Sequence, residues 1–358
     1  MLLAAGGTGG HLFPAEALAA ALAARGVAVE LATDARAVGY GGKFPARATH
    51  VIPSATPRGP FGYAKAGAVI ALGVAKAYRL LGRLRPAAVV GFGGYPSVPA
   101  VLAAVLRRIP SVIHEQNGVM GRANRLLAPR VTAFATSFAG VVEAEPALAA
   151  KATRTGNPLR PAVLAAIAPY VVPEPNGPLR LLAFGGSQGA RIMADVVPPA
   201  VERLDEAVRA RLAVVQQART EDLERVRATY ARLRVTAEVA PFFQDLPARI
   251  AAAHLVVSRS GASTVVELAA LSRPAVLVPL PHALDQDQLA NAKVLEAAGG
   301  AVLLRQDVFT PQRLAREIAA LAADPARLSA MASGARSAGA PDAADRLADL
   351  VMRVAKLS

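Results

Sequence analysis

Short apolar runs alternate with longer amphipathic stretches along most of this chain. Met1–Ala5 is apolar, a glycine-rich turn follows it, and a helical pattern covers about residues 12–25. The same order recurs at Ala87–Val90, before a second glycine turn, and at Leu181–Phe184, before a third. Short buried strands that alternate with helices predict parallel βαβ units. The pattern therefore indicates an α/β protein built on parallel sheets.

The clearest unit lies between Leu255 and Ala292. A strand is expected at Leu255–Val257, then a polar turn at residues 258–261, a helix through Leu271 and a second strand at Ala275–Val278. Ser260 in this turn is typical of a helix N-cap, which would leave the amides of residues 261–263 facing outward. The partial positive charge of such a helix start suits a phosphate.

Carboxylates and amides near this helix suggest what else binds there. Glu267 lies four residues after Ser263, on the same helical face, and is suited to ribose hydroxyls. The loop expected at residues 279–288 ends in Asp285, Gln286, Asp287 and Gln288, whose side chains are suited to sugar hydroxyls. The first interpretation is a nucleotide-sugar site; the alternative is an ordinary βαβ unit with a capped helix and a solvated loop.

Three further polar clusters are expected at the carboxyl ends of strands, where open α/β sheets bind ligands. Residues 6–11 read GGTGGH, but Leu12 occupies the third glycine position of the dinucleotide fingerprint. Glu30, which is expected to end the next strand, lies near the spacing of the acid that binds ribose in dehydrogenases. The missing third glycine nevertheless disfavours a nicotinamide site. His11 starts the first helix, where it serves either as a general base or only as a cap. Residues 91–97 form another glycine turn, and residues 114–117 read HEQN.

Composition narrows the class of protein. The chain has 358 residues, is 53% hydrophobic and 18% charged, and has no cysteine, which excludes disulfides and thiolate metal sites. Met1–Ala5 runs into a glycine loop without a basic leader, so we expect no signal peptide. Ala66–Ala75 is too short to cross a bilayer, and glycines and prolines interrupt Pro86–Leu106.

The net charge of +14 is unevenly distributed, because residues 35–114 contain lysines and arginines but no acidic residue. Such a segment indicates an anionic partner. Nucleic acid is disfavoured by the lack of interleaved aromatic residues and of a known binding module. An anionic membrane surface fits better, since the helix expected at Ala64–Leu84 has basic residues and an aliphatic face. The alternative is a solvated arginine-rich face whose aliphatic stripe belongs to the core.

Two halves of similar pattern follow each other. Residues from Thr153 to Pro178 are rich in proline and glycine and are interpreted as the linker, after which a strand and the glycine turn at residues 185–190 repeat the first half. Helical pattern dominates from Pro311 onward. We therefore expect two doubly wound domains with a cleft between them.

Taken together, the ordered motifs resemble the MurG family of peptidoglycan enzymes. They are GGTGGH (6–11), GFGGYPS (91–97), HEQN (114–117), TGNPLR (155–160), GGSQGA (185–190), RSGASTVVE (259–267) and QLANA (288–292), and the likeness runs from residue 1 to residues 341–343. The resemblance implies a GT-B fold, α/β with two Rossmann-like domains. Residues 1–158 would form the acceptor and membrane-facing domain, residues 159–339 the UDP-GlcNAc domain, and a helix at about 340–358 would return to the first.

The resemblance also implies the reaction. It is an inverting transfer of N-acetylglucosamine from UDP-GlcNAc to the muramyl 4-hydroxyl of undecaprenyl-pyrophosphoryl-MurNAc-pentapeptide, which converts lipid I to lipid II. It would place the chain in peptidoglycan synthesis, and so in cell-wall biogenesis, cell shape and division, peripherally on the cytoplasmic face of the cell membrane. The alternatives are a nucleotide-sugar epimerase of similar two-domain fold and a non-catalytic membrane recruitment subunit.

Each matching residue carries an implied role. His11 would be the catalytic base, with Glu115 and Asn117 as further catalytic residues. Gly93, Gly94, Tyr95 and Ser97 would lie on the acceptor side. The residues implied for UDP-GlcNAc are Thr8, Gly9, Gly10, Asn117, Arg160, Ser187, Gln188, Phe243, Ala262, Ser263, Thr264, Val265, Val266, Glu267, Asp287 and Gln288.

Metal dependence and one sequence departure complete these expectations. The Asp285-Gln286-Asp287 triplet resembles the DxD motif of metal-dependent transferases, but it lies in the loop expected to bind the sugar. We therefore expect no metal site and no required cofactor. The sequence leaves open whether a divalent metal stimulates the reaction. The family usually has Gln or His where this chain has Asp287. Because an aspartate accepts but does not donate a hydrogen bond, that sugar contact is the least secure.

Overall fold

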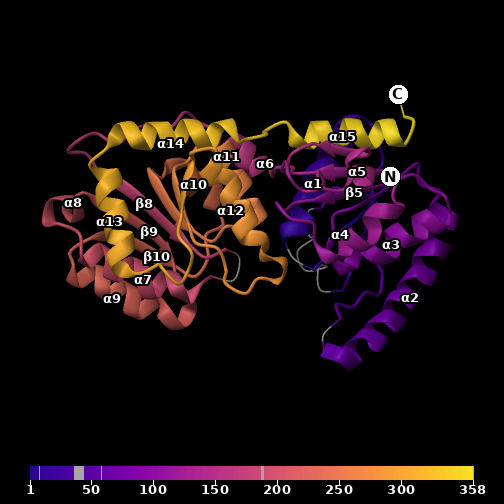
Figure 1. Ribbon diagram of the computed structural model, residues 1–358, viewed down its shortest axis with the longest axis horizontal. Coiled ribbons are helices and arrows are strands. Elements are labelled where there is room, and N and C mark those ends of the chain that lie inside the picture. The colour runs from indigo at the N-terminus through magenta and orange to yellow at the C-terminus, as the bar shows by residue number, and fades with distance from the viewer. Residues whose placement is uncertain (8, 36–43, 58, 187–188, 358) are drawn as a thin grey trace. The chain divides into compact units, whose positions relative to one another are not determined.

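The computed structural model describes residues 1–7, 9–35, 44–57, 59–186 and 189–357, and the chain divides into two compact units (Figure 1). Unit 1 comprises Met1–Arg160 together with Ala340–Ser358, and unit 2 comprises Pro161–Gly339. This division falls two residues after the boundary placed from the sequence. Two separate parallel sheets, one in each unit, confirm the predicted α/β class.

Unit 1 is built on a sheet of seven parallel strands in the order β3-β2-β1-β4-β5-β6-β7. Its strands are β1 (Leu2–Ala4), β2 (Glu30–Thr33), β3 (Thr49–Val51), β4 (Val89–Gly91), β5 (Ser111–Glu115), β6 (Ala133–Thr136) and β7 (Ala152–Arg154). Its helices are α1 (Gly9–Ala24), α2 (Gly59–Leu84), α3 (Gly94–Leu106), α4 (Arg122–Leu127), the 3-10 turn η2 (Ala128–Arg130), α5 (Pro146–Ala149) and α15 (Ala343–Val354).

The central strands of unit 1, such as β1, β4, β5 and β6, are buried on both faces, as the apolar runs predict. On β1, Leu2 and Ala4 belong to one core and Leu3 to another, because successive side chains point to opposite faces of a strand. α2, α3 and α4 contribute to the first core, and α1 and α15 contribute to the second. This explains how a sheet of three- to five-residue strands is stabilised.

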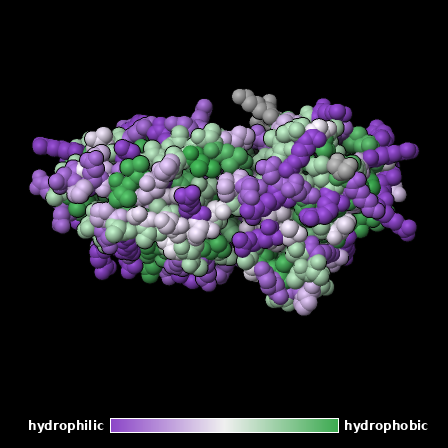
Figure 2. Space-filling model, turned by 90° about the horizontal axis from the view of Figure 1, so that it is seen from above, coloured by the Kyte–Doolittle hydropathy of each residue, from purple (hydrophilic) through white to green (hydrophobic). Residues whose placement is uncertain are grey.

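Helix α15 returns to unit 1 because one of its faces is apolar. Leu347, Ala348, Leu350 and Val351 are buried in the core that α1 also lines. The Arg25 guanidinium at the end of α1 lies 3.1 Å from a carboxylate oxygen of each of two aspartates of α15, Asp345 and Asp349. The opposite side of α15 is exposed, and hydrophilic residues are prominent on the face seen in Figure 2.

Unit 2 repeats the architecture with six parallel strands in the order β10-β9-β8-β11-β12-β13. Its strands are β8 (Leu179–Phe184), β9 (Leu212–Gln217), β10 (Thr236–Ala240), β11 (Leu255–Ser258), β12 (Ala275–Leu277) and β13 (Ala301–Leu303). Its helices are α6 (Pro161–Ala165), α7 (Arg191–Glu202), α8 (Glu206–Ala210), η3 (Thr220–Asp222), α9 (Leu223–Arg232), α10 (Leu246–Ala252), α11 (Ala262–Ala270), η4 (Leu284–Gln286), α12 (Asp287–Ala297), α13 (Pro311–Ala322) and α14 (Pro325–Ser337).

Three local predictions of secondary structure were wrong at their edges. Glu30 begins β2 instead of ending it, and its carboxylate lies 2.6 Å from His50 Nε2. Thr153 belongs to β7, the edge strand of unit 1, so the linker starts later than expected. Asp287 is the first residue of α12 and not part of a loop. In each case pairing or helix propagation overrides the local turn signal.

Among the described residues, no helix is long and apolar enough to cross a membrane.

Candidate active site

In both units the strand order reverses beside the first strand, and the loops of interest lie at this point. In unit 1, β1 lies between β2 and β4; in unit 2, β8 lies between β9 and β11. Open α/β sheets bind ligands outside the carboxyl ends of their strands at such a position. The predicted glycine turns after β1, β4 and β8 and the polar turn after β11 all follow these strands.

A side chain from the neighbouring strand holds each first glycine turn. In unit 1, Asp34 Oδ1 accepts a hydrogen bond of 3.0 Å from Gly7 N, and a Cβ on Gly6 would lie 2.7 Å from the same oxygen. In unit 2, Gln217 Oε1 accepts one of 2.9 Å from Gly185 N, while Gln217 Nε2 donates to Pro241 O. The sequence analysis missed both residues, although each is a polar side chain at the end of an apolar strand.

His11 lies in the first turn of α1, where the motif places it. Its Nδ1 is 3.2 Å from Gln116 Oε1, and a Cβ on Gly94 would lie 3.1 Å from its Nε2. Gly94 has φ +65°, a conformation that side chains disfavour, so glycine here both allows the turn and leaves room beside the imidazole. Gly9 and Gly10 begin the same helix, whereas Thr8 lies outside the described residues.

Glu115, for which a catalytic role is expected, is held by hydrogen bonds within the protein. It is buried at the end of β5, and each of its oxygens accepts two hydrogen bonds. Oε1 accepts from Asn117 N at 3.0 Å and from Asn117 Nδ2 at 3.2 Å; Oε2 accepts from Gly121 N at 2.9 Å and Asn124 Nδ2 at 2.8 Å. These four donors use the acceptor sites of the carboxylate, so Glu115 orders the loop that carries Asn117.

The two larger residues expected on the acceptor side pack within unit 1. Ser97 is fully buried, and its hydroxyl donates to Gly94 O at 2.9 Å, so it stabilises the start of α3. Tyr95 is half-buried and packs against the core beneath α3. Gly93, with φ +76°, forms the N-cap of α3, and a Cβ there would lie 3.3 Å from Asn124 Nδ2. Gly93 and Gly94, both with positive φ, thus form the turn that begins α3.

His114 is the most strongly perturbed titratable group of this cluster. It is fully buried in β5, and burial lowers its pKa to about 4; the nearby His11 also lowers the pKa, whereas the hydrogen bond that His114 donates to Gly156 O raises it. His114 is therefore neutral at physiological pH. The sequence analysis identified it as part of HEQN but gave it no role.

Arg160, the last residue of unit 1, lies against α1. Its guanidinium is 4.6 Å from the centroid of the Phe13 ring, and it lowers the pKa of Glu16, which burial raises. Its stacking on α1 brings it to the helix that begins with Gly9 and carries His11.

The start of α11 in unit 2 forms the predicted amide cluster, but with a different cap. Gly261, not Ser260, is the N-cap, and no described side chain caps the first turn, Ala262–Thr264. Ser260 is buried, and its hydroxyl donates to Gln288 O at 2.8 Å, 28 residues away. The first-turn amides thus lie after a small, side-chain-free cap, a geometry suited to an anion.

The buried Arg259 side chain stabilises the turn between β11 and α11. Its guanidinium donates to Val278 O at 3.1 Å, to Pro279 O at 3.0 Å and to Gln306 Oε1 at 2.6 Å, and burial lowers its pKa. It therefore ties the end of β11 to the chain that leaves β12. The sequence analysis placed Arg259 in the turn without assigning this task.

The remaining donor-side residues surround α11 and α12. Glu267 is buried on α11 beyond Val265 and Val266, and Asp287 accepts a hydrogen bond from Gln288 N while burial raises its pKa. Gln288 Oε1 accepts from Leu280 N at 3.0 Å, so part of its amide holds the loop.

Phe243 is buried in the loop after β10, beneath the Arg249 guanidinium at 4.3 Å from its ring centroid. Ser187 and Gln188 lie outside the described residues. Among the residues that are described, no group of three or more His, Asp or Glu side chains is arranged to hold a metal ion.

Comparisons with known proteins agree along the whole chain. Residues 1–136 match the glycosyltransferase family 28 N-terminal domain, and residues 180–347 match the family 28 C-terminal domain. A protein of Rhodopseudomonas palustris (strain BisA53) is 62% identical over 99% of this chain and 96% of its own length; one from Nitrobacter hamburgensis is 58% identical over 100% and 97%. Both are named UDP-N-acetylglucosamine–N-acetylmuramyl-(pentapeptide) pyrophosphoryl-undecaprenol N-acetylglucosamine transferase.

Solved structures separate the transferase from the alternative enzyme. Acinetobacter baumannii MurG is 31% identical, with a TM-score of 0.80 and 98% of each chain covered. The UDP-GlcNAc 2-epimerase of Neisseria meningitidis is 14% identical with a TM-score of 0.70, covering 98% of this chain and 99% of its own, a likeness of fold alone. The epimerase alternative is therefore not favoured. The chain has the GT-B fold and belongs to glycosyltransferase family 28 and, within it, to the MurG family of N-acetylglucosaminyltransferases.

Proposed function

We propose that this protein transfers N-acetylglucosamine from UDP-GlcNAc to the muramyl 4-hydroxyl of undecaprenyl-pyrophosphoryl-MurNAc-pentapeptide, with inversion at the anomeric carbon. Identity of about 60% over the whole length of curated transferases carries this proposal. The reaction forms lipid II from lipid I in peptidoglycan synthesis.

The donor binds to unit 2. The first-turn amides of α11, Ala262–Thr264, face the diphosphate, and Glu267 on the same helix accepts from the ribose hydroxyls. Ser187 and Gln188 add contacts to the diphosphate, Phe243 supplies a backbone contact to uracil, and Asp287 and Gln288 bind the sugar. Because the diphosphate gains negative charge as it leaves, these preoriented amides stabilise the transition state more than the bound donor.

The acceptor binds to unit 1 beside Gly93 and Gly94. His11 accepts the proton of the muramyl hydroxyl while that oxygen attacks the anomeric carbon from the face opposite UDP. Asn117 and Arg160 complete the donor contacts from this unit. Positioning the base and the nucleophile in one complex converts an encounter into a unimolecular step.

The His11→Ala variant tests the base. We expect its kcat to fall by about a hundred- to ten-thousandfold, the range for removal of a positioned general base, with the KM for UDP-GlcNAc unchanged because unit 2 is intact. His50→Ala is the matched control, since His50 pairs with Glu30 on the outer strands of the same sheet. Label should pass from UDP-GlcNAc to lipid only when acceptor is supplied. Conversion of the labelled sugar into another sugar without acceptor would contradict the transfer reaction. Full turnover by His11→Ala would contradict the assignment of His11 as the base.

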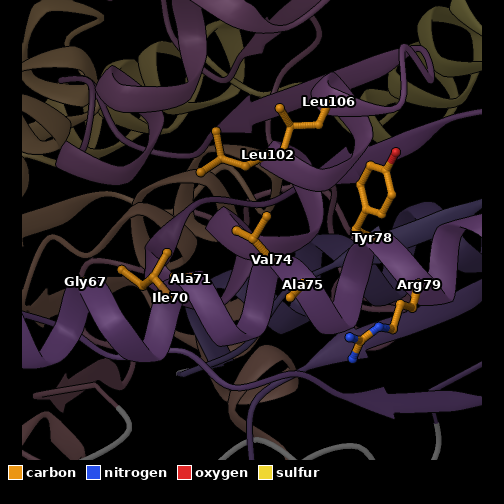
Figure 3. Close-up of a pocket in the computed structure, with 9 residues that line it drawn as sticks. All are labelled: Gly67, Ile70, Ala71, Val74, Ala75, Tyr78, Arg79, Leu102 and Leu106. Atoms are coloured by element: carbon orange, nitrogen blue, oxygen red, sulfur yellow. The ribbon is translucent and has the colours of Figure 1, made fainter.

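The surface formed by α2 and α3 supports peripheral attachment to an anionic membrane. A groove of about 690 Å³ lies between the helices, where Ile70, Val74 and Tyr78 of α2 face Leu102 and Leu106 of α3 (Figure 3). Leu72 and Leu106 are 67% and 64% exposed, which is costly in water and favourable in lipid.

Basic side chains flank this groove. Arg107 lies with its guanidinium 3.8 Å from the centroid of the Tyr78 ring, and the exposed cations of α2 and the following turn are Lys65, Lys76, Arg79, Arg83 and Arg85. Apolar side chains bordered by cations match the chemistry of an anionic bilayer surface, with the acyl region beneath the headgroups. This chemistry supports the proposal that the protein lies peripherally on the cytoplasmic face of the membrane, because a bilayer, unlike a nucleic acid, offers an apolar region to the exposed aliphatic side chains.

Vesicle partitioning tests the surface. Replacing Lys76, Arg79, Arg83 and Arg85 with glutamine should weaken binding to vesicles containing anionic lipid by roughly a thousandfold, at about 1 kcal/mol per cation, and less at high salt. The matched control replaces four exposed arginines of unit 2, Arg234, Arg305, Arg316 and Arg336, for the same change in net charge. Equal losses in the two proteins contradict a specific membrane face.

A further inference from the structure

A continuous series of hydrogen bonds joins the backbone of Gly156 to the imidazole of His11. His114 Nε2 is 2.9 Å from Gly156 O, and Gln116 Nε2 is 3.0 Å from His114 Nδ1. The same Gln116 nitrogen is 3.1 Å from His114 O, and Gln116 Oε1 is 3.2 Å from His11 Nδ1. Gln116 and His114 are both buried, with 2% and 0% of their surface exposed, so water does not compete for these contacts.

The two backbone carbonyls fix the direction of every bond in the series. A carbonyl oxygen only accepts, so His114 Nε2 carries a proton toward Gly156 and, in the neutral ring, His114 Nδ1 presents a lone pair. His114 O likewise requires that the Gln116 atom beside it is the NH₂ group, which settles the orientation of the amide. The opposite amide atom, Oε1, must then accept, and only a protonated His11 Nδ1 can donate to it.

We propose that Gln116, oriented by His114, is a positioning residue that holds His11 in the tautomer with its proton on Nδ1, so that Nε2 is the atom that accepts the proton of the acceptor hydroxyl. This inference rests on the proposed role of His11 as the base. It assigns a task to the two members of HEQN that the transfer mechanism does not otherwise use.

The reaction step balances with this assignment. The muramyl O–H bond breaks and its proton forms the N–H bond at His11 Nε2. The oxygen lone pair forms the new bond to the anomeric carbon, and the electron pair of the carbon–oxygen bond to UDP leaves with the diphosphate. The resulting imidazolium keeps its Nδ1–H bond to Gln116 Oε1, which strengthens because the donor is now charged.

The surroundings of His11 also favour Nε2 as the atom that accepts the proton. Its Nε2 lies next to Gly94, where an added Cβ would be 3.1 Å away, so glycine leaves that nitrogen accessible. His114 stays neutral because burial lowers its pKa to about 4, which preserves the lone pair on Nδ1 that Gln116 needs. A charged His114 would present a proton to the amide NH₂ and would disrupt the series.

Nitrogen-15 NMR of protein with ring-labelled histidine tests the tautomer without any assay of activity. At pH 8, we expect His11, assigned by the signal lost in His11→Ala, to show a protonated Nδ1 and an unprotonated Nε2. Gln116→Leu, which removes the acceptor opposite Nδ1, should convert it to a mixture of tautomers, whereas Ser137→Ala, which removes a buried hydrogen bond outside the series, should keep the wild-type form. An unprotonated Nδ1 in the wild-type protein overturns the inference.

Kinetics provides the second readout. For Gln116→Leu we expect kcat to fall about ten- to a hundredfold, the scale of residues that orient a catalytic ligand, with KM for UDP-GlcNAc within about twofold. Ser137→Ala is the control, because it removes a buried 2.8 Å hydrogen bond to Glu115 O on the same strand but lies outside the series. Equal effects of the two variants would overturn the positioning role. Normal turnover by His11→Ala together with the expected tautomer would instead refute the proposed base.

Discussion

Replacing His114 with glutamine should change how stability depends on pH. In the folded protein burial lowers the pKa of His114 to about 4, whereas an unfolded histidine titrates at about 6.5. Between these values the unfolded chain binds a proton that the folded chain does not. The free energy of unfolding therefore falls as pH decreases from 6.5 to 4, and the contribution is constant above and below this window.

The size of the effect follows from the displacement of the pKa. Lowering the pKa of His114 from 6.5 to about 4 corresponds to about 3 kcal/mol, because each tenfold change in proton affinity is worth about 1.4 kcal/mol. Solvent screening does not reduce it appreciably, because the side chain is 0% exposed. A change of this size is a large part of the net stability of a domain.

Urea unfolding of wild type and His114→Gln at pH 7 and pH 4 measures this effect. The stability advantage of wild type over the variant should shrink by about 3 kcal/mol between the two conditions. His254, which burial also brings to a pKa of about 4, is present in both proteins and cancels in the difference.

Ser137→Ala, which changes no titratable group, serves as the control, and its destabilisation should be the same at both pH values. A wild-type advantage over His114→Gln that is identical at pH 7 and pH 4 would refute the claim that His114 is neutral in the folded protein.

Two further predictions concern the turns that carry the site. Gly94→Ala adds a Cβ 3.1 Å from His11 Nε2 at a φ of +65°, so the rate of transfer should fall at least tenfold and the free energy of unfolding by about 1 kcal/mol. The affinity for UDP, measured by calorimetry, should be unchanged. A fully active variant would show that His11 Nε2 does not need this space. Gln217→Leu removes the acceptor for Gly185 N, so UDP should bind about tenfold more weakly, as expected for loss of about 1.4 kcal/mol. An unchanged affinity for UDP would show that the turn at Gly185 does not bind the diphosphate.

Patterns within the sequence determined the fold class and placed the motifs of the candidate site at the ends of strands. Apolar strands, glycine turns and amphipathic helices predict doubly wound α/β halves because burial on both faces of a parallel strand leaves a continuous apolar run. The turn after β11 and the HEQN segment lie at the carboxyl ends of strands, as predicted. His11 and Gly94, which are far apart in the sequence, lie together because β1 and β4 are neighbours in the sheet.

Only the tertiary structure decided which polar side chains have partners within the protein and so support the loops. Glu115 and Ser97 carry suitable chemistry, yet Glu115 is saturated by four donors and Ser97 is buried against Gly94 O. Ser260 has the composition of a cap, but its hydroxyl bonds to Gln288 O. The physical reason is that a polar group removed from water must find a partner, and the partners come from distant parts of the chain that local sequence does not specify.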